Sequence, residues 1–130
     1  MSSIKQFEDL EIWVKARIQA KAISTIIQNG NFKNDFSAIK QILTASASVM
    51  HNIAEGFGRG GNREFVNFLS ISRGSNDETR SELYVAFDRN YLDEATFTSL
   101  IEENKMLSNK ISNFINYLNK SEIKGQKFNR

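Results

Sequence analysis

The chain has 130 residues, with one histidine, no cysteine, no proline and a formal net charge of +2. This length fits one domain with its own core, and the lack of cysteine excludes disulfides and thiolate zinc sites. Four basic residues and one acidic residue lie among the last twelve, so the first 118 residues sum to −1. Because the sequence shows neither a secretion signal nor an apolar run near the ~20 residues of a membrane span, we expect a cytoplasmic protein with no membrane contact.

The first predicted helix covers residues 8–28 and has two apolar stripes. One consists of Trp13, Ala16, Ala20, Ile23 and Ile27, and the other of Phe7, Leu10, Val14 and Ile18. Apolar residues spaced by three and four share one face of a helix. Gly30 lies just past the end, where a left-handed cap closes many helices.

The second predicted helix covers residues 35–56. Its apolar positions alternate steps of three and four: Phe36, Ile39, Leu43, Ser46, Met50, Ile53 and Phe57. Asn34 or Asp35 is placed to cap its start. We expect Gly56 to end it.

The stretch GFGRGG, residues 56–61, matches the pattern G-x-G-x-x-G. A dinucleotide site needs a strand before this loop, whereas here the helical period continues up to Glu55. We therefore interpret the stretch as a bend in which Gly58, Gly60 and Gly61 take positive φ and Asn62 caps the next helix. Glu55 opposes the helix dipole in the last turn, which predicts an ion pair with Arg59 or Arg80 or a partner contact.

The third and fourth predicted helices cover residues 62–90 and 94–120. The fourth has a heptad seam with one polar member, Asn104, and Asp93 is placed to cap its start. Four helices joined by short loops predict an all-α fold, an antiparallel up-down-up-down bundle over residues 1–120. Residues 121–130 form a basic tail that we expect to lie outside the bundle and to lack order.

Small residues are concentrated where the second and third helices should meet. They are Ala45, Ser46, Ala47 and Ser48 on one side and Ser72, Gly74, Ser75 and Thr79 on the other. Glycine inside a helix costs about 1 kcal/mol relative to alanine, so we expect close backbone approach at Gly74 to offset it. A serine nucleophile would need a base, and only His51 is available. No Glu-x-x-His motif occurs, so we predict no catalytic residue, no metal and no cofactor.

The apolar surface exceeds what one bundle needs. The first helix has two stripes, and Ile101, Ile115 and Tyr117 lie outside the seam of the fourth. Exposed apolar area usually marks a partner. We expect a cyclic homo-oligomer to bury it between protomers.

Three blocks of the sequence, FEDLEIWVKA, NIAEGFGRG and REFVNFLSISRGSNDE, together resemble the 23S rRNA intervening-sequence proteins. The resemblance spans about residues 7–92 and implies a homopentameric barrel of four-helix protomers without known catalytic activity. The family includes accessory proteins of diversity-generating retroelements, which bind nucleic acid and a reverse transcriptase. Many relatives have a basic pair where this chain has Leu43 and Thr44, and often Phe-Pro where it has Phe32 and Lys33.

The resemblance and the charges together define the candidate functional residues. Those that match the family motif are Asn52, Glu55, Gly56, Arg59, Phe65, Phe68, Gly74, Ser75 and Glu78. The predicted phosphate contacts are Arg59, Arg63, Arg73, Arg80, Arg89, Lys120, Lys124, Lys127 and Arg130. Glu78 matches a position that the family keeps acidic, so we expect it to bond to another helix or subunit. Our first hypothesis is a non-enzymatic, self-assembling scaffold or accessory module that holds nucleic acid. The alternative is a protein-binding module with no nucleic-acid role.

Overall fold

Four long helices account for nearly all of the chain in the computed structural model, which describes the backbone of residues 4–128 and the side chains of residues 4–121. A 3-10 turn, η1 (Phe7–Asp9), precedes α1 (Glu11–Gln28), α2 (Phe36–Gly58), α3 (Asn62–Asp88) and α4 (Glu94–Phe128). No strand occurs in the described part. The all-α, four-helix prediction is therefore confirmed.

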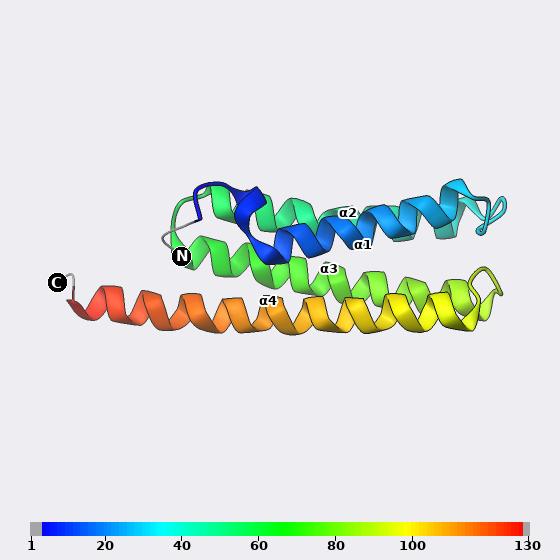
Figure 1. Cartoon of the computed structure of the whole chain (residues 1–130). Coiled ribbons are helices and arrows are strands. Elements are labelled where there is room, and N and C mark those ends of the chain that lie inside the picture. The colour runs from blue at the N-terminus through cyan, green and yellow to red at the C-terminus, as the bar shows by residue number, and fades with distance from the viewer. Residues whose placement is uncertain (1–3, 129–130) are drawn as a thin grey trace.

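The helices lie side by side as two pairs, α1 with α2 and α3 with α4 (Figure 1). The α1–α2 and α3–α4 connections lie together at one end, and the α2–α3 connection lies at the other end with η1. No described helix is long and apolar enough to cross a membrane.

Several helix ends differ from the predicted ones. The first helix begins at Glu11 instead of residue 8, because Leu10 is extended (φ −79°, ψ 125°) and separates α1 from η1. The third ends at Asp88 instead of residue 90, and the fourth continues past residue 120 to Phe128. In the predicted tail, residues 129–130 and the side chains of Lys124, Lys127 and Arg130 lie outside the described part.

The predicted caps are present at three ends. Asp35 caps α2 by accepting from the amide of Ala38 at 3.2 Å, and Asp93 accepts from the amide of Thr96 at 2.7 Å at the start of α4. Gly30 has φ +85°, as its position after α1 predicts.

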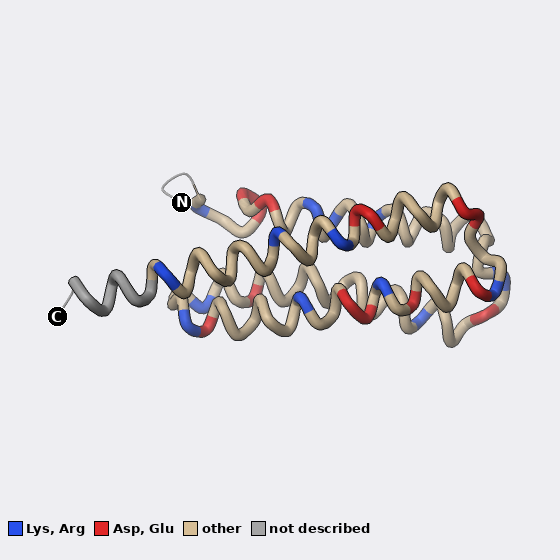
Figure 2. Tube along the Cα trace, turned by 90° about the horizontal axis from the view of Figure 1, so that it is seen from below, with Lys and Arg blue, Asp and Glu red and all other residues tan. Residues whose placement is uncertain are grey.

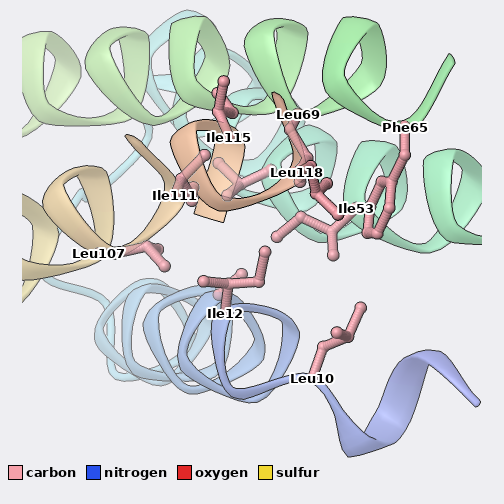
Figure 3. Close-up of a cluster of buried hydrophobic side chains, with 11 residues drawn as sticks. Leu10, Ile12, Ile53, Phe65, Leu69, Leu107, Ile111, Ile115 and Leu118 are labelled. Atoms are coloured by element: carbon pink, nitrogen blue, oxygen red, sulfur yellow. The ribbon is translucent and has the colours of Figure 1, made fainter. Parts of the chain in front are cut away.

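Two apolar clusters form the core, one at each end of the bundle. The cluster near η1 contains Leu10, Ile12, Ala16, Val49, Ile53, Phe65, Leu69, Leu107, Ile111, Ile115 and Leu118 (Figure 3). The cluster near the α1–α2 connection contains Ile23, Phe32, Ala38, Ile42, Leu83, Ala86, Leu92 and Ile101. Ile101 and Ile115 are each only 7% exposed, so the prediction that they add to the apolar surface is wrong.

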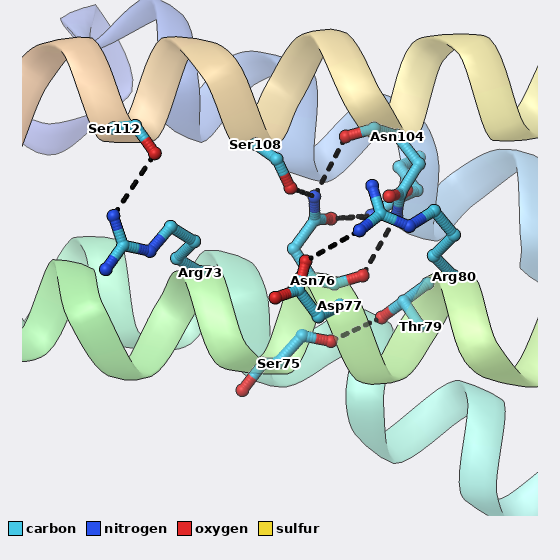
Figure 4. A network of polar contacts seen from close by, with 10 residues as sticks. Arg73, Ser75, Asn76, Asp77, Thr79, Arg80, Asn104, Ser108 and Ser112 are labelled. Carbon is cyan, nitrogen blue, oxygen red and sulfur yellow. Dashed lines mark hydrogen bonds and ion pairs between the residues drawn. The ribbon is translucent and has the colours of Figure 1, made fainter.

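A layer of buried amides lies between the two clusters. Figure 4 shows two of its members, Asn76 and Asn104, with Ser108. Asn104 Nδ2 donates to Gln19 Oε1 at 2.8 Å, and Gln19 Nε2 donates to Asn76 Oδ1 at 2.9 Å. Asn76 Nδ2 in turn donates to the Asn104 carbonyl at 2.9 Å and to Ser108 Oγ at 2.8 Å. Asn76 and Asn104 are both fully buried. Because buried amides are costly when unpaired, this layer links α1, α3 and α4 at one level.

The Asp35 carboxylate links the α1–α2 connection to the α3–α4 connection at their shared end of the bundle. It accepts a 2.7 Å hydrogen bond from the Tyr91 hydroxyl and forms an ion pair with Arg89 at 2.7 Å. The Tyr91 hydroxyl, the Ala38 amide and Arg89 lower the pKa of Asp35 below its ordinary 3.8. The same contact with Asp35 raises the pKa of Tyr91.

Replacing Asp35 by asparagine should therefore lower the thermal midpoint in a pH-dependent manner. A lowered carboxyl pKa stabilises the fold above pH 3.8, and that contribution is lost as the pH falls through the folded-state pKa. The difference in midpoint from the wild type should be largest near neutral pH and should shrink in acid. Calorimetry from pH 2 to pH 7 measures it, with the exposed Asp88→Asn as the control. A difference that is constant with pH would contradict this assignment.

Candidate functional site

Seven of the nine motif residues lie together where α2 meets α3. We call this edge the α2–α3 seam; it consists of Ser48, Asn52, Glu55, Gly56, Arg59, Phe65, Phe68 and Ser75, with Ser48 added by the structure. Gly56 is buried at its centre. A Cβ atom there would lie 2.7 Å from Phe68 Cβ and 2.9 Å from Phe65 Cδ1. Gly56 therefore permits the close packing of the two helices.

The glycine at which we expected this close approach is Gly74, and that prediction is wrong. Gly74 is exposed, and a Cβ atom built on it meets nothing within 4 Å. Ser72, two residues earlier on the buried face of α3, makes the contact instead, since its hydroxyl donates to the Val49 carbonyl at 2.7 Å. The helices thus approach through Gly56 and Ser72.

Three polar side chains continue the seam toward the middle of the bundle. Ser48 Oγ and Ser75 Oγ lie 2.9 Å apart, so one hydroxyl donates to the other across the helices. Asn52 Nδ2 donates to the Ser48 carbonyl at 2.8 Å and to Ser48 Oγ at 3.0 Å. All three are half-buried, so these bonds are partly shielded from water.

Arg59 covers the end of the seam beside the α2–α3 connection. It pairs with Glu55 at 3.0 Å and with Glu64 at 4.0 Å, and its guanidinium lies 5.1 Å from the centre of the Phe68 ring. The structure thus assigns Arg59 as the partner of Glu55. Arg80, the alternative partner, pairs with Asp77 at 3.1 Å.

The glycine-rich stretch differs from its predicted geometry at four residues. Helix α2 continues through Gly56 to Gly58, so Gly56 does not end it. In the stretch, Gly60 alone has positive φ, at +86°. Gly61 is the N-cap of α3, with φ −115°, and Asn62 is the first helical residue instead of the cap. The bend therefore needs one left-handed glycine, and the helical residues before it differ from the strand of a dinucleotide site.

The acidic and imidazole groups outside these contacts do not converge. His51 is exposed on α2, and the described residues contain no group of three His, Cys, Asp or Glu side chains that could hold a metal ion. Glu78 is exposed and belongs to no ion pair in the described part, so a bond to a neighbouring helix is absent there. A bond from Glu78 to another subunit stays a prediction.

Most of the arginines predicted to contact phosphate already have partners within the chain. Arg59, Arg80 and Arg89 form ion pairs with carboxylates, and Arg73 donates to Ser112 Oγ at 3.2 Å. Arg63 and Lys120 are exposed. Lysine and arginine alternate with aspartate and glutamate along the bundle instead of gathering on one face (Figure 2).

A second surface feature lies between α1 and α4. Open pockets follow the length of this face, and Ile18, Ala22, Ile26, Leu100 and Phe114 contribute apolar walls. In the described part, the exposed large hydrophobic side chains are Val14, Ile18, Phe36, Ile71, Tyr84, Met106 and Tyr117. Four of them lie on this face: Ile18 and Tyr117 line its pockets, Val14 is one turn from Ile18, and Met106 is one turn from the lining residue Glu103. We call it the α1–α4 face.

The comparisons with known proteins agree with this architecture. The sequence model of the 23S rRNA-intervening sequence protein family matches residues 8–113, most of the chain. The chain belongs to this family. A crystal structure of a protein of unknown function from the S23 ribosomal protein family of Bacteroides thetaiotaomicron is similar, with a TM-score of 0.73 and 21% identity over 80% of this chain and 97% of that one. A search of curated proteins gives no match.

The family match includes the whole α2–α3 seam and most of the α1–α4 face. Sequence reasoning found the motif residues and placed Ser48 and Ser75 on facing sides of the two helices, but it did not pair these two hydroxyls, and it did not find Met106 as part of an exposed face. Ser48 lies one turn before Asn52, so its helical spacing was a usable signal. Met106 lies just before Leu107, a member of the heptad repeat of α4. Its exposure could be recognised only once the buried face of α4 was known.

Proposed function

We propose that this member of the 23S rRNA-intervening sequence protein family is a non-enzymatic scaffold or accessory protein whose antiparallel four-helix protomers assemble through the α1–α4 face. The observation that carries the proposal is the exposed apolar surface of that face. Ile18 is 60% exposed, and Met106 and Tyr117 are each 47% exposed. Contiguous exposed apolar surface on a small domain usually marks an interface.

A cyclic homo-oligomer is the arrangement that we propose for this assembly, and the family resemblance implies five copies. A ring buries the same pair of contact surfaces between every two neighbours, so neither of these two surfaces is left unpaired in any copy. The α2–α3 seam then stays available for a partner. The seam then serves as a rigid recognition surface, since Gly56 and the serine–asparagine bonds fix its shape.

For the partner of the assembled protein, the charges favour another polypeptide over nucleic acid. Non-specific phosphate binding needs unpaired positive charge on one surface. Here four of the predicted arginine contacts are engaged within the chain, and acidic residues are interspersed among the basic ones. Nucleic-acid contact through Arg63, Lys120 and the C-terminal basic residues stays a prediction.

Replacing Ile18 by serine should weaken self-association about tenfold or more. Burying an isoleucine side chain contributes roughly 1.5–3 kcal/mol, and each 1.4 kcal/mol corresponds to a factor of ten in Kd. Light scattering of the wild type over a dilution series should give a multiple of the 14.8 kDa chain mass. Ile71→Ser, which changes an equally apolar side chain on α3 that is 53% exposed, is the control. A wild type that remains a single chain at micromolar concentration would reject the proposal.

A further inference from the structure

Two exposed strips of opposite character border the α1–α4 face. The α1 strip consists of Val14, Ile18 and Lys21, and the α4 strip of Glu102, Met106 and Asn109; all six side chains are exposed. Each strip follows the spacing i, i+4, i+7, so its members lie on one side of their helix. Each strip thus has an exposed apolar residue and, about one turn away, a charge that is basic on α1 and acidic on α4.

The internal contacts of the bundle fix the relative heights of these strips. Gln19 and Asn104 are hydrogen-bonded at 2.8 Å, and Glu11 pairs with Lys110 at 3.2 Å, so α1 and α4 run in opposite directions with Gln19 level with Asn104. A helix rises 1.5 Å per residue. Lys21 lies two residues after Gln19, and Glu102 lies two residues before Asn104. Both charges therefore lie about 3 Å from the amide layer, on the same side of it.

The apolar members of the strips lie at matching heights as well. Ile18 precedes Gln19 by one residue and Met106 follows Asn104 by two, which places them about 1.5 Å and 3 Å from the amide layer, both on its other side. Because a rotation about an axis parallel to the helices leaves every height unchanged, it brings the α1 strip of one copy level with the α4 strip of the next. Apolar then meets apolar, and basic meets acidic.

These charges have no role in the ion pairs of the protomer. The five ion pairs of the described residues include neither Lys21 nor Glu102. On this side of the amide layer, Lys21 is the charged residue of α1, and the charged residues of α4 are Glu94, Glu102 and Glu103. The two helices therefore present edges of opposite sign, which is the complementarity that steers and orients association between two surfaces.

We infer that the α1 strip of one copy packs against the α4 strip of a second copy, with Ile18 on Met106 and Lys21 opposite Glu102. This inference rests on the proposed self-assembly and names the two surfaces that make it. Because the surfaces differ, each copy gives one and receives the other, which is the contact that a ring requires.

Charge reversal in separate chains tests the inference. Lys21→Glu and Glu102→Lys each place like charges across the contact, so each variant alone should self-associate about tenfold more weakly at low ionic strength. In an equal mixture of the two variants, opposite charges meet again at every contact between unlike variants. Because a ring of five still contains at least one contact between like variants, the assembly should be restored toward that of the wild type, well beyond either variant alone. The differences should shrink as salt screens the charges. Lys40→Glu, which makes the same charge change at an exposed position of α2, should leave the mass unchanged.

The mixture separates contacts between copies from contacts within one chain, since a pair inside the protomer would not be restored by mixing. Circular dichroism of each variant should show an unchanged helix content. A wild type that assembles while both reversed variants keep its Kd, or a mixture that stays dissociated, would overturn the assignment of the strips and leave the proposed function standing. A wild type that does not assemble would reject both.

Discussion

Replacing Asn76 by aspartate should destabilise the protein by about 3–5 kcal/mol at pH 7, the usual cost of an uncompensated buried charge. The change removes the hydrogen bonds that Asn76 donates to the Asn104 carbonyl at 2.9 Å and to Ser108 Oγ at 2.8 Å. It also places a carboxylate beside that carbonyl, in a site that is fully buried. Chemical denaturation monitored by circular dichroism measures the loss.

The pH dependence of this variant identifies the buried charge as the cause. Burial raises a carboxyl pKa, so the folded variant holds its proton more tightly than the unfolded chain does. Relative to the wild type, its free energy of unfolding should therefore fall as the pH rises above about 4, where an unfolded aspartate ionises. Asn67→Asp, the same change at an exposed position of α3, should have little effect. A deficit equal at pH 4 and pH 7 would contradict this explanation.

Two glycine-to-alanine substitutions should change stability in opposite directions. Gly56→Ala should lower the free energy of unfolding by about 1–3 kcal/mol, because overpacking exceeds the gain of about 1 kcal/mol in helix propensity. The new methyl group would lie 2.7 Å from Phe68 Cβ, which cannot rotate away, and 2.9 Å from Phe65 Cδ1. The two helices would have to separate at the α2–α3 seam.

Gly74→Ala is the matched variant, because Gly74 also lies inside a long helix but no other residue packs against it. Its methyl group would meet nothing within 4 Å, so only the propensity gain of about 0.5–1 kcal/mol remains and the variant should be more stable than the wild type. Thermal and urea denaturation of the two variants side by side measure both signs. Equal effects at the two positions would show that the close contact at Gly56 is not what limits the packing of α2 on α3.

The contrast between these glycines shows where sequence reasoning succeeds and where it stops. Helical periodicity predicted all four helices, and the chemistry of Asp35, Asp93 and Gly30 predicted three helix ends. The spacing on α3 also placed small residues toward α2. Periodicity does not give the depth at which each residue lies, however, so Gly74 was expected at a contact that Gly56 and Ser72 make.

The polar layer illustrates a related limit. Asn104 stands out in the sequence because it interrupts an apolar heptad repeat, but Gln19 and Asn76 resemble surface residues. Their burial depends on all three amides reaching one level of the bundle, which follows from how α1, α3 and α4 are aligned. Such an alignment is a tertiary property. The spacing from Ser72 to Asn76 to Thr79 was the one local sign that Asn76 faces inward.

The buried amides have a consequence for the outside of the molecule. If one helix slid along its neighbours by a single turn of 5.4 Å, Gln19, Asn76 and Asn104 would lose their partners inside an apolar interior, and this penalty leaves the protomer only one axial alignment. The heights of Ile18, Lys21, Glu102 and Met106 on the surface are fixed by the same alignment. A substitution in the buried amide layer can therefore change the height of the α1 strip relative to the α4 strip. Such a substitution would abolish assembly without altering any residue at the contact.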